Sequence, residues 1–287
     1  MRWNVVLIDP PGYRFGHFLH DTARYLVHGL QSLGHDCILS RSNVDGGRMN
    51  VLLNAHMLAT PADVEQLGRV PYIVYQTEVI RQGQTNLDPD ERHRKVYLPL
   101  LRGARRVWDW SADNVALLQE QGIGADWLRL GHHPALEEIH HKREKDIDFL
   151  FYGSVTPHRA AILTALAESG RRVRAEFDVM PLYRNDLIAR SRVVLTLRQS
   201  EEMDHLPYFR INYLVNNRSL VAGETGVDGA WMEDVFLGCP PGRTVEHLLE
   251  TAARKDLAEV AQAHHAQLLT RPMTGFLAVV LAKDLNI

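Results

Sequence analysis

The sequence is poor in cysteine, with only Cys37 and Cys239 among its 287 residues. Two cysteines, one in each half, supply neither a disulfide framework nor the spaced pairs of a zinc site. Such low usage is typical of a reducing compartment, so we expect a cytoplasmic protein. The first apolar run, Val5 to Ile8, is too short to be the core of a signal peptide, which agrees with that expectation.

Strong net charge and long apolar runs are also lacking. The formal net charge is −3, so no excess of basic residues predicts binding to nucleic acid. No apolar run approaches the roughly 20 residues of a membrane-spanning helix, so any membrane contact would be peripheral. Gly12 and Gly16 are followed by no third glycine at the spacing of the dinucleotide-binding fingerprint, which argues against a dehydrogenase.

The first half instead alternates short apolar runs with amphipathic ones. Helical spacing of apolar residues predicts a helix over Phe18–Leu33, which Gly34 ends, and a second helix over Asp113–Gln121. Strands that alternate with helices predict βαβ units and a largely parallel sheet. The expected strands are Trp3–Ile8, Asp36–Leu39, Met49–Asn54, Tyr72–Tyr75, Arg106–Asp109 and Asp126–Leu130.

The alternation resumes after a polar, charged stretch at 135–147. A strand at Asp148–Tyr152 precedes these expected elements: helix Pro157–Glu168, strand Arg172–Phe177, helix Tyr183–Ala189, strand Val193–Leu197, helix Ile211–Val215 and strand Ser219–Ala222. We therefore expect an α/β protein with two Rossmann-like domains facing across a cleft. The predicted domains are 1–134 and 148–271, joined by the linker 135–147, and a C-terminal helix at 272–287 packs back on the first domain.

The start of the second domain carries the clearest functional pattern. The apolar strand runs into Gly153 and Ser154, and a helix follows with Thr156 as its N-cap and Pro157 in first position. Free backbone N–H groups at such a helix start bind phosphate. Arg159 follows within the first turn of that helix, and its alternative role is a solvated surface charge.

Several segments resemble one enzyme family. Phe149–Ser154 with Arg159, Asn185–Leu195, and Phe209–Leu214 with the following Ser219–Gly223 resemble the donor domain of nucleotide-sugar-dependent glycosyltransferases of the GT-B architecture. The compact bacterial enzymes grouped with CgeB-like proteins are the most similar. Val107–Ser111 and Leu130–Pro134 resemble the last strands before their hinge. The resemblance implies metal-independent transfer of a sugar from a nucleotide-sugar co-substrate to an unknown acceptor, without a bound cofactor.

The resemblance also implies a donor site. Gly153, Ser154, Arg159, Arg198 and Asn212 are its predicted donor-binding residues, and Arg210 is predicted to act in catalysis. Asn212 departs from the family, which usually has a glutamate for the donor ribose at that position. Arg198 and Arg210 have a structural interpretation as well, for example an ion pair with Asp204.

The acceptor side is expected in the first domain. His17 is the first choice for the general base, ahead of Glu78 and Asp109, because neutral imidazole accepts a hydroxyl proton near pH 7. Tyr13, His20 and His56 are the other acceptor-side candidates, since the ends of the expected strands bring them to the cleft.

Three alternatives remain at this point. An epimerase of related architecture would need a second acid or base, for which Asp9, Glu78 and Glu224 are candidates. A catalytically inactive partner subunit and a binding protein of the periplasmic type are the others. No metal ligands are expected, because the paired histidines at 132–133, 140–141 and 264–265 fit no ligand pattern and are predicted to be polar surface.

Overall fold

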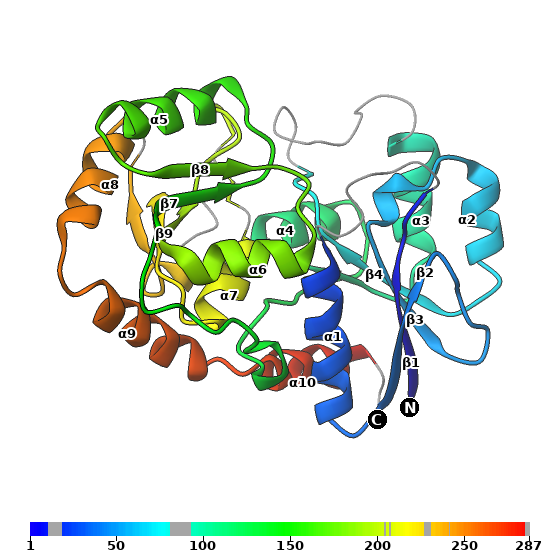
Figure 1. The fold of residues 1–287 in the computed structure, drawn as a ribbon. Helices are drawn as coiled ribbons and strands as arrows, with labels where there is room; N and C mark the ends of the chain where they lie inside the picture. Colours follow the sequence, from blue (N-terminus) through cyan, green and yellow to red (C-terminus); the bar gives the residue numbers. More distant parts are fainter. Residues whose placement is uncertain are drawn as a thin grey trace. The chain divides into compact units, whose positions relative to one another are not determined.

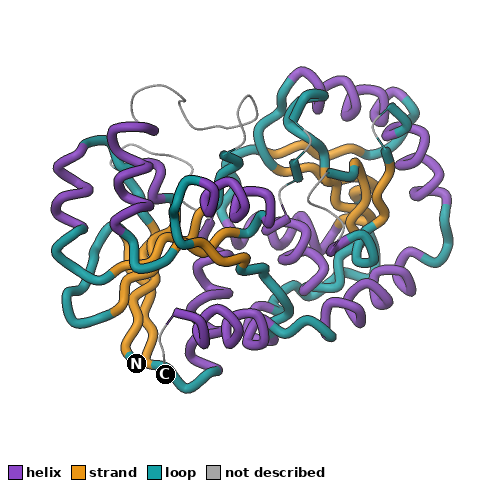
Figure 2. The backbone as a smooth tube through the Cα atoms, turned by 180° about the vertical axis from the view of Figure 1, so that it is seen from behind, coloured by secondary structure: helices purple, strands orange, loops and turns teal. Residues whose placement is uncertain are grey.

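The computed structural model describes residues 1–10, 19–80, 93–203, 205–206, 208–226, 231–240 and 242–284. The chain divides into two compact units. Unit 1 is Met1–His133 together with Pro272–Ile287, and unit 2 is Pro134–Arg271. Each unit is built on one parallel sheet with helices around it (Figures 1 and 2). The prediction of two parallel-sheet α/β domains is therefore confirmed.

The sheet of unit 1 has the strand order β2-β1-β3-β4-β5-β6. Its strands are β1 (Arg2–Leu7), β2 (Asp36–Arg41), β3 (Met49–Leu53), β4 (Tyr72–Gln76), β5 (Val107–Asp109) and β6 (Ala125–Trp127). Every residue of β3 and β4 is buried, as expected for central strands of a parallel sheet that is covered on both faces.

Helices of unit 1 cover this sheet in two groups. The helices α2 (Pro61–Leu67), α3 (Leu98–Gly103) and α4 (Ala112–Glu120) share a buried core with strand residues such as Val6 and Val74. The helix α1 (His20–Ser32) packs against β1, β2 and the C-terminal helix α10 (Met273–Asp284). Gly29 of α1 permits a close approach, since a Cβ atom there would lie 2.4 Å from Cδ1 of Leu277.

The sheet of unit 2 has the strand order β11-β10-β9-β7-β8. Its strands are β7 (Ile147–Tyr152), β8 (Val173–Glu176), β9 (Ser191–Thr196), β10 (Val221–Glu224) and β11 (Leu237–Cys239). The chain leaves β7 for β8 on one side and then returns to β9 on the other. The carboxyl ends of β7 and β9 therefore form a topological switch point, where open α/β sheets bind their ligands.

Helices also surround the sheet of unit 2 (Figure 1). The helices α5 (Pro157–Glu168), α8 (Thr244–Ala253) and α9 (Leu257–Leu269) share one core cluster with Phe149 and Phe151 of β7. The helix α6 (Pro181–Arg190) packs against β7 and β9, and α7 (Tyr208–Asn216) packs against β10 and α9. Among the described residues, no helix is long and apolar enough to cross a membrane.

Some sequence predictions need correction. The short elements α2, α3 and β11 were not predicted, and β10 ends at Glu224 rather than at Ala222. The extension was missed because a glutamate rarely occupies a buried strand position. The paired histidines are not all surface residues either, since His133 and His265 are 6% and 1% exposed. Each has a hydrogen-bond partner, Ser32 Oγ for His133 at 3.0 Å and the Val215 carbonyl for His265 at 3.1 Å.

Candidate functional site

The turn after β7, which the sequence predicts to bind phosphate, begins at Gly153. Gly153 has a φ of +141°, a backbone conformation that residues other than glycine rarely adopt. Its N–H donates to the Glu176 carbonyl at 2.8 Å, which ties the turn to the end of β8. A Cβ atom on Gly153 would lie 2.8 Å from Nη2 of Arg210. Glycine is therefore favoured here by the backbone conformation, and it leaves room for that guanidinium.

The backbone of this turn retains free donors. The N–H groups of Ser154, Val155, Thr156 and His158 donate to no acceptor in the described part of the chain. Ser154 and Val155 are exposed, while the Thr156 hydroxyl caps α5 by accepting from the Arg159 N–H at 3.4 Å. Unpaired N–H groups at the start of a helix attract anions, because they carry the positive end of the helix dipole.

Arg159 holds this turn in place. The side chain is 7% exposed and donates to the carbonyls of Leu197 (2.9 Å), Arg198 (2.9 Å) and Ser154 (2.9 Å). Burial, reinforced by the nearby charge of Arg210, lowers the pKa of Arg159 to about 10. Because its donors are directed at backbone carbonyls on both sides of the switch point, Arg159 positions the loops after β7 and β9. It is neither the solvated surface charge considered above nor a free cation.

Arg210 lies in the first turn of α7 and differs from Arg159 in its partners. Its guanidinium lies over the rings of Tyr152 and Phe151, at 4.8 and 5.5 Å from their centroids. The side chain is half-buried, Nη1 is fully shielded and has no hydrogen-bond partner, and burial lowers the pKa of the group. No carboxylate of the described residues forms an ion pair with it. A shielded cation without a counter-charge is costly, so this arrangement is suited to an anionic ligand.

Arg198 and Asn212 are the remaining donor-side candidates. Arg198 follows β9, and its Nε donates to the Thr225 carbonyl at 2.8 Å without a carboxylate partner in the described chain. Asn212 is fully buried in α7. Its role as a donor contact remains a prediction from the resemblance.

A pair of residues that was not predicted from the sequence lies at the same edge of the sheet. Glu224, at the end of β10, is fully buried, and both of its carboxylate oxygens lie near His158 Nε2, at 2.9 and 3.1 Å. The Arg198 N–H and the Thr244 hydroxyl also donate to Glu224, at 2.7 and 3.2 Å. Glu224 was considered only as an acid or base of an epimerase, and His158 not at all. The available signal was a glutamate at the end of an otherwise apolar strand.

Unit 1 brings other predicted residues together at the carboxyl edge of its own sheet. His56 follows β3 and Glu78 follows β4, and His56 Nε2 lies 3.7 Å from Glu78 Oε1. His56 also meets the ring of Tyr97 edge-on at 6.3 Å. His20 is the first residue of α1 and is partly exposed. Tyr13 and His17, the first choice for the general base, lie outside the described residues.

Asp109 completes this polar group of unit 1. It is fully buried at the end of β5 and accepts from the Ser111 N–H at 2.8 Å and from Gln76 Nε2 at 3.1 Å. Burial, followed by the charge of Asp109, raises the pKa of Tyr75 and Tyr97 well above the usual range. Unit 1 therefore presents two carboxylates and one imidazole at the ends of its central strands.

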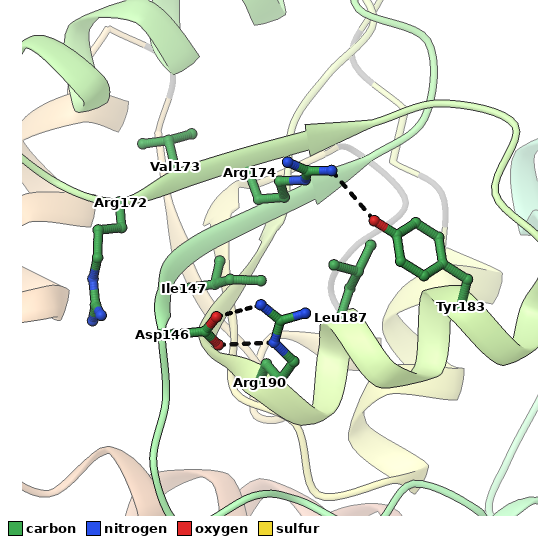
Figure 3. A pocket seen from close by; sticks show the side chains of 8 residues that line it. All are labelled: Asp146, Ile147, Arg172, Val173, Arg174, Tyr183, Leu187 and Arg190. Atoms are coloured by element: carbon green, nitrogen blue, oxygen red, sulfur yellow. Dashed lines mark hydrogen bonds and ion pairs between the residues drawn. The ribbon is translucent and has the colours of Figure 1, made fainter.

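A cavity of about 290 Å³ lies elsewhere in unit 2, beside α6 and the starts of β7 and β8 (Figure 3). Eight residues line it: Asp146, Ile147, Arg172, Val173, Arg174, Tyr183, Leu187 and Arg190. Its arginines already pair with carboxylates, such as Arg190 with Asp146 and Arg172 with Asp148. Without an uncompensated charge, and at the opposite ends of the strands, this cavity is a weaker candidate than the Gly153 turn.

Comparisons with known proteins agree on the fold. No protein-family model matches the sequence, and no curated protein matches it. The solved structure of AviGT4, a glycosyltransferase of avilamycin A biosynthesis, is 16% identical, with a TM-score of 0.59 over 99% of this chain and 96% of that one. T4 phage β-glucosyltransferase is 10% identical with a TM-score of 0.57, and both chains are fully covered.

An enzyme of another class also shares the fold. The UDP-GlcNAc 2-epimerase of Neisseria meningitidis, solved with bound UDP-GlcNAc, is 8% identical with a TM-score of 0.51, over 99% of each chain. At such low identities these similarities show the architecture of the chain and leave its reaction open.

Proposed function

We propose that this protein is a glycosyltransferase that moves a sugar from a nucleotide-sugar donor to an acceptor. The observation that carries the proposal is the shielded Nη1 of Arg210, which has no hydrogen-bond partner among the described residues. The guanidinium lies beside a turn with free backbone N–H groups. A diphosphate supplies the negative charge and the acceptor oxygens that this arrangement lacks.

In the proposed reaction, an acceptor hydroxyl attacks the anomeric carbon while the bond from that carbon to the diphosphate breaks. Negative charge builds on the departing nucleoside diphosphate, and groups fixed in advance stabilise it most effectively. Arg210 and the N–H groups of Ser154 and Val155 supply this stabilisation, and Arg159 keeps the turn in place. With the Arg210 cation and these N–H groups in place, the proposed reaction needs no metal ion for charge neutralisation.

The acceptor hydroxyl must lose its proton if the transfer inverts the anomeric centre. We assign the base to unit 1, where His17 remains the prediction from the sequence. Glu78, 3.7 Å from His56, is the described alternative. Its carboxylate would take the proton directly.

Epimerisation of a nucleotide sugar is the second candidate. The buried carboxylate and imidazole pair of Glu224 and His158 favours it, since an epimerase needs acid and base groups near the sugar. Both candidates use the same donor site and differ in their products. The narrower placement among bacterial CgeB-like enzymes and the cytoplasmic location remain predictions from the sequence.

The test is thermal unfolding with UDP, GDP, dTDP, ADP, CMP and NAD, followed by incubation with the corresponding nucleotide sugars. A rise in the unfolding midpoint with one nucleotide, lost in Arg210→Met, would support the donor site, and release of that nucleotide would support transfer. The control is Arg254→Met, whose guanidinium forms an exposed ion pair with Asp256 in the same unit. No rise with any nucleotide would refute the proposal, and an epimeric nucleotide sugar as product would favour the second candidate.

A further inference from the structure

We infer that two copies of this chain associate by pairing their β8 strands edge to edge in antiparallel orientation. β8 is the last strand of the unit 2 sheet, and no described strand lies on its outer side. Arg174 and Ala175 in the middle of β8 are both exposed. An open strand edge presents backbone donors and acceptors with which a second strand can pair. The association does not depend on the proposed reaction.

The backbone of β8 determines which of its residues can pair with a second strand. The carbonyls of Arg172 and Glu176 accept from N–H groups of β7 and of the turn after it, at 3.2 and 2.8 Å. Because backbone groups alternate in direction along a strand, the groups of Val173 and Ala175 point outward. These outward N–H and carbonyl groups have no hydrogen-bond partner in the described part of the chain.

The outward groups define the register of the pair. In an antiparallel pair, residues that face each other either exchange hydrogen bonds or both point away from the partner strand. Ala175 can therefore face Ala175 of the second copy, and the two alanines exchange a pair of backbone hydrogen bonds. The same register places Arg174 of each copy opposite Glu176 of the other.

This register makes β8 self-complementary in charge. Arg174 and Glu176 form an ion pair within one chain, and residues two positions apart lie on the same face of a strand. Arg174 also donates to the Tyr183 hydroxyl at 3.3 Å (Figure 3). Pairing of two copies places each guanidinium between two carboxylates, so that four charges alternate in sign. Opposite charges that face each other across an antiparallel pair stabilise it, whereas like charges destabilise it.

The edge strand β2 of unit 1 lacks this property. Its charged ends are Asp36 and Arg41. The Ser42 N–H donates to the Leu7 carbonyl at 3.0 Å, so the even-numbered residues of β2 face β1 and the odd-numbered ones face outward. Asp36 and Arg41 therefore point in different directions and cannot face each other in an antiparallel pair of two copies. Charge complementarity favours β8 over β2.

Exposed apolar side chains follow β8 directly. Phe177, Met180 and Leu182 are 50, 62 and 87% exposed, between the end of β8 and the first turn of α6. Large apolar side chains that are exposed together are typical of an interaction surface. In the antiparallel register Phe177 lies opposite Val173 of the second copy, which adds apolar contact to the backbone hydrogen bonds.

The experiment is sedimentation velocity of the whole protein at roughly 10–500 µM, because a short strand pair predicts a weak dimer. We expect the sedimentation coefficient to rise with concentration. Ala175→Pro removes an outward N–H and keeps the hydrogen bonds to β7, so it should weaken the association by about tenfold or more. The control is Leu39→Pro, which removes an outward N–H from β2 and should leave the association unchanged.

Exchange of the two charges tests the register. Arg174→Glu and Glu176→Arg should each abolish the association, because each places like charges opposite one another, and the double variant should restore it. A wild type that stays monomeric at the highest concentration would overturn the inference. Association that is unchanged in Ala175→Pro, or a double variant that associates no better than the single ones, would overturn it as well.

Discussion

Arg159 and Arg210 lie beside the same turn, and the structure gives them opposite sets of partners. Arg159 donates to carbonyls on two loops, whereas Arg210 has a shielded nitrogen for which the described residues offer no acceptor. The first arrangement stabilises the fold, and the second is expected to cost stability until a ligand binds. Substitutions at the two positions should therefore separate stability from binding.

Arg210→Met should weaken the binding of the nucleotide that stabilises the wild type, without destabilising the protein. The loss of a charge-assisted contact is expected to cost about 1.5–3 kcal/mol, roughly 10- to 100-fold in affinity. The free energy of unfolding should stay the same or rise, because methionine fills the space without a shielded charge. Calorimetric titration and urea unfolding measure the two quantities, and a large loss of stability would show that Arg210 is a structural residue.

Arg159→Met should destabilise the protein in the absence of any ligand. The substitution leaves the buried Leu197 carbonyl, and the partly buried carbonyls of Arg198 and Ser154, without the Arg159 donor, so we expect a loss of about 3 kcal/mol. Urea unfolding without nucleotide checks this. If the urea concentration at the unfolding midpoint is the same as in the wild type, the hydrogen bonds of Arg159 do not stabilise the turn.

At the scale of residues, the sequence predicted where the arginines lie better than it predicted which groups they contact. Arg159, Arg198 and Arg210 were placed near strand ends because strand and helix starts are visible in the apolar pattern. Their hydrogen-bond partners were not predictable, because the backbone carbonyls that accept from a guanidinium come close to it only in the folded chain. His158 and Glu224 were not paired because 66 positions of chain separate them and no local pattern links them.

At the scale of elements, the packing of α10 on α1 depends on Gly29. A Cβ atom at position 29 would lie 2.4 Å from Leu277 Cδ1, so Gly29→Ala should cost about 1–3 kcal/mol through overpacking, despite the better helix propensity of alanine. Gly275 of α10 is the matched control, because its Cβ atom would meet only Pro272 at 3.5 Å. Gly275→Ala should leave stability unchanged or raise it by about 1 kcal/mol.

A double-mutant cycle tests this contact. Leu277→Ala removes the atom that the added Cβ would meet, so Gly29→Ala should be less harmful in the Leu277→Ala background than in the wild type. Free energies of unfolding from urea titration give the coupling. Additive effects of the two substitutions would mean that the helices do not meet at these positions.

The start of β7 is joined to the start of β8 by Asp148 and Arg172. Arg172 donates to Asp148 through its backbone N–H at 2.9 Å and its Nη2 at 3.0 Å, and these contacts hold the pKa of Asp148 below its usual value of 3.8. Because the folded state has the lower pKa, the carboxylate stabilises the protein above about pH 4, and this stabilisation is lost as the pH falls through the lowered value.

Asp148→Asn should therefore be less stable than the wild type at pH 6, and the difference should shrink towards pH 3. We expect about 1 kcal/mol at pH 6, a modest effect because Arg172 is largely exposed and solvent screens the pair. Asp256→Asn, which breaks the exposed pair with Arg254, is the control and should change little. A difference that does not depend on pH would rule out the charge as its origin.

The elements themselves were predictable where the apolar pattern was strong. The predicted helix Pro157–Glu168 has the observed bounds, because Thr156 and Pro157 mark its start in the sequence. The strand β11, with the sequence Leu-Gly-Cys, was missed because three residues contain no readable alternation. The helix α3 was missed because six residues cannot show a helical period.

At the scale of the whole molecule, unit 2 is one continuous piece of chain, whereas unit 1 combines the two ends. We predict that residues 134–271 fold alone and bind the nucleotide that stabilises the whole protein, with an affinity within about tenfold of that of the whole protein, which corresponds to about 1.4 kcal/mol. Circular dichroism and calorimetric titration of this fragment test it. Residues 1–133 alone should unfold more easily, because they lack α10 with its buried Met273 and Leu277.

The most direct test of the donor site is a crystal structure of the protein with the nucleoside diphosphate selected by the thermal unfolding experiment. The account predicts the diphosphate at the Gly153 turn, within hydrogen-bond distance of the Ser154 and Val155 N–H groups and of the Arg210 guanidinium. A diphosphate bound instead in the cavity of Figure 3, or at the carboxyl edge of the unit 1 sheet, would contradict it.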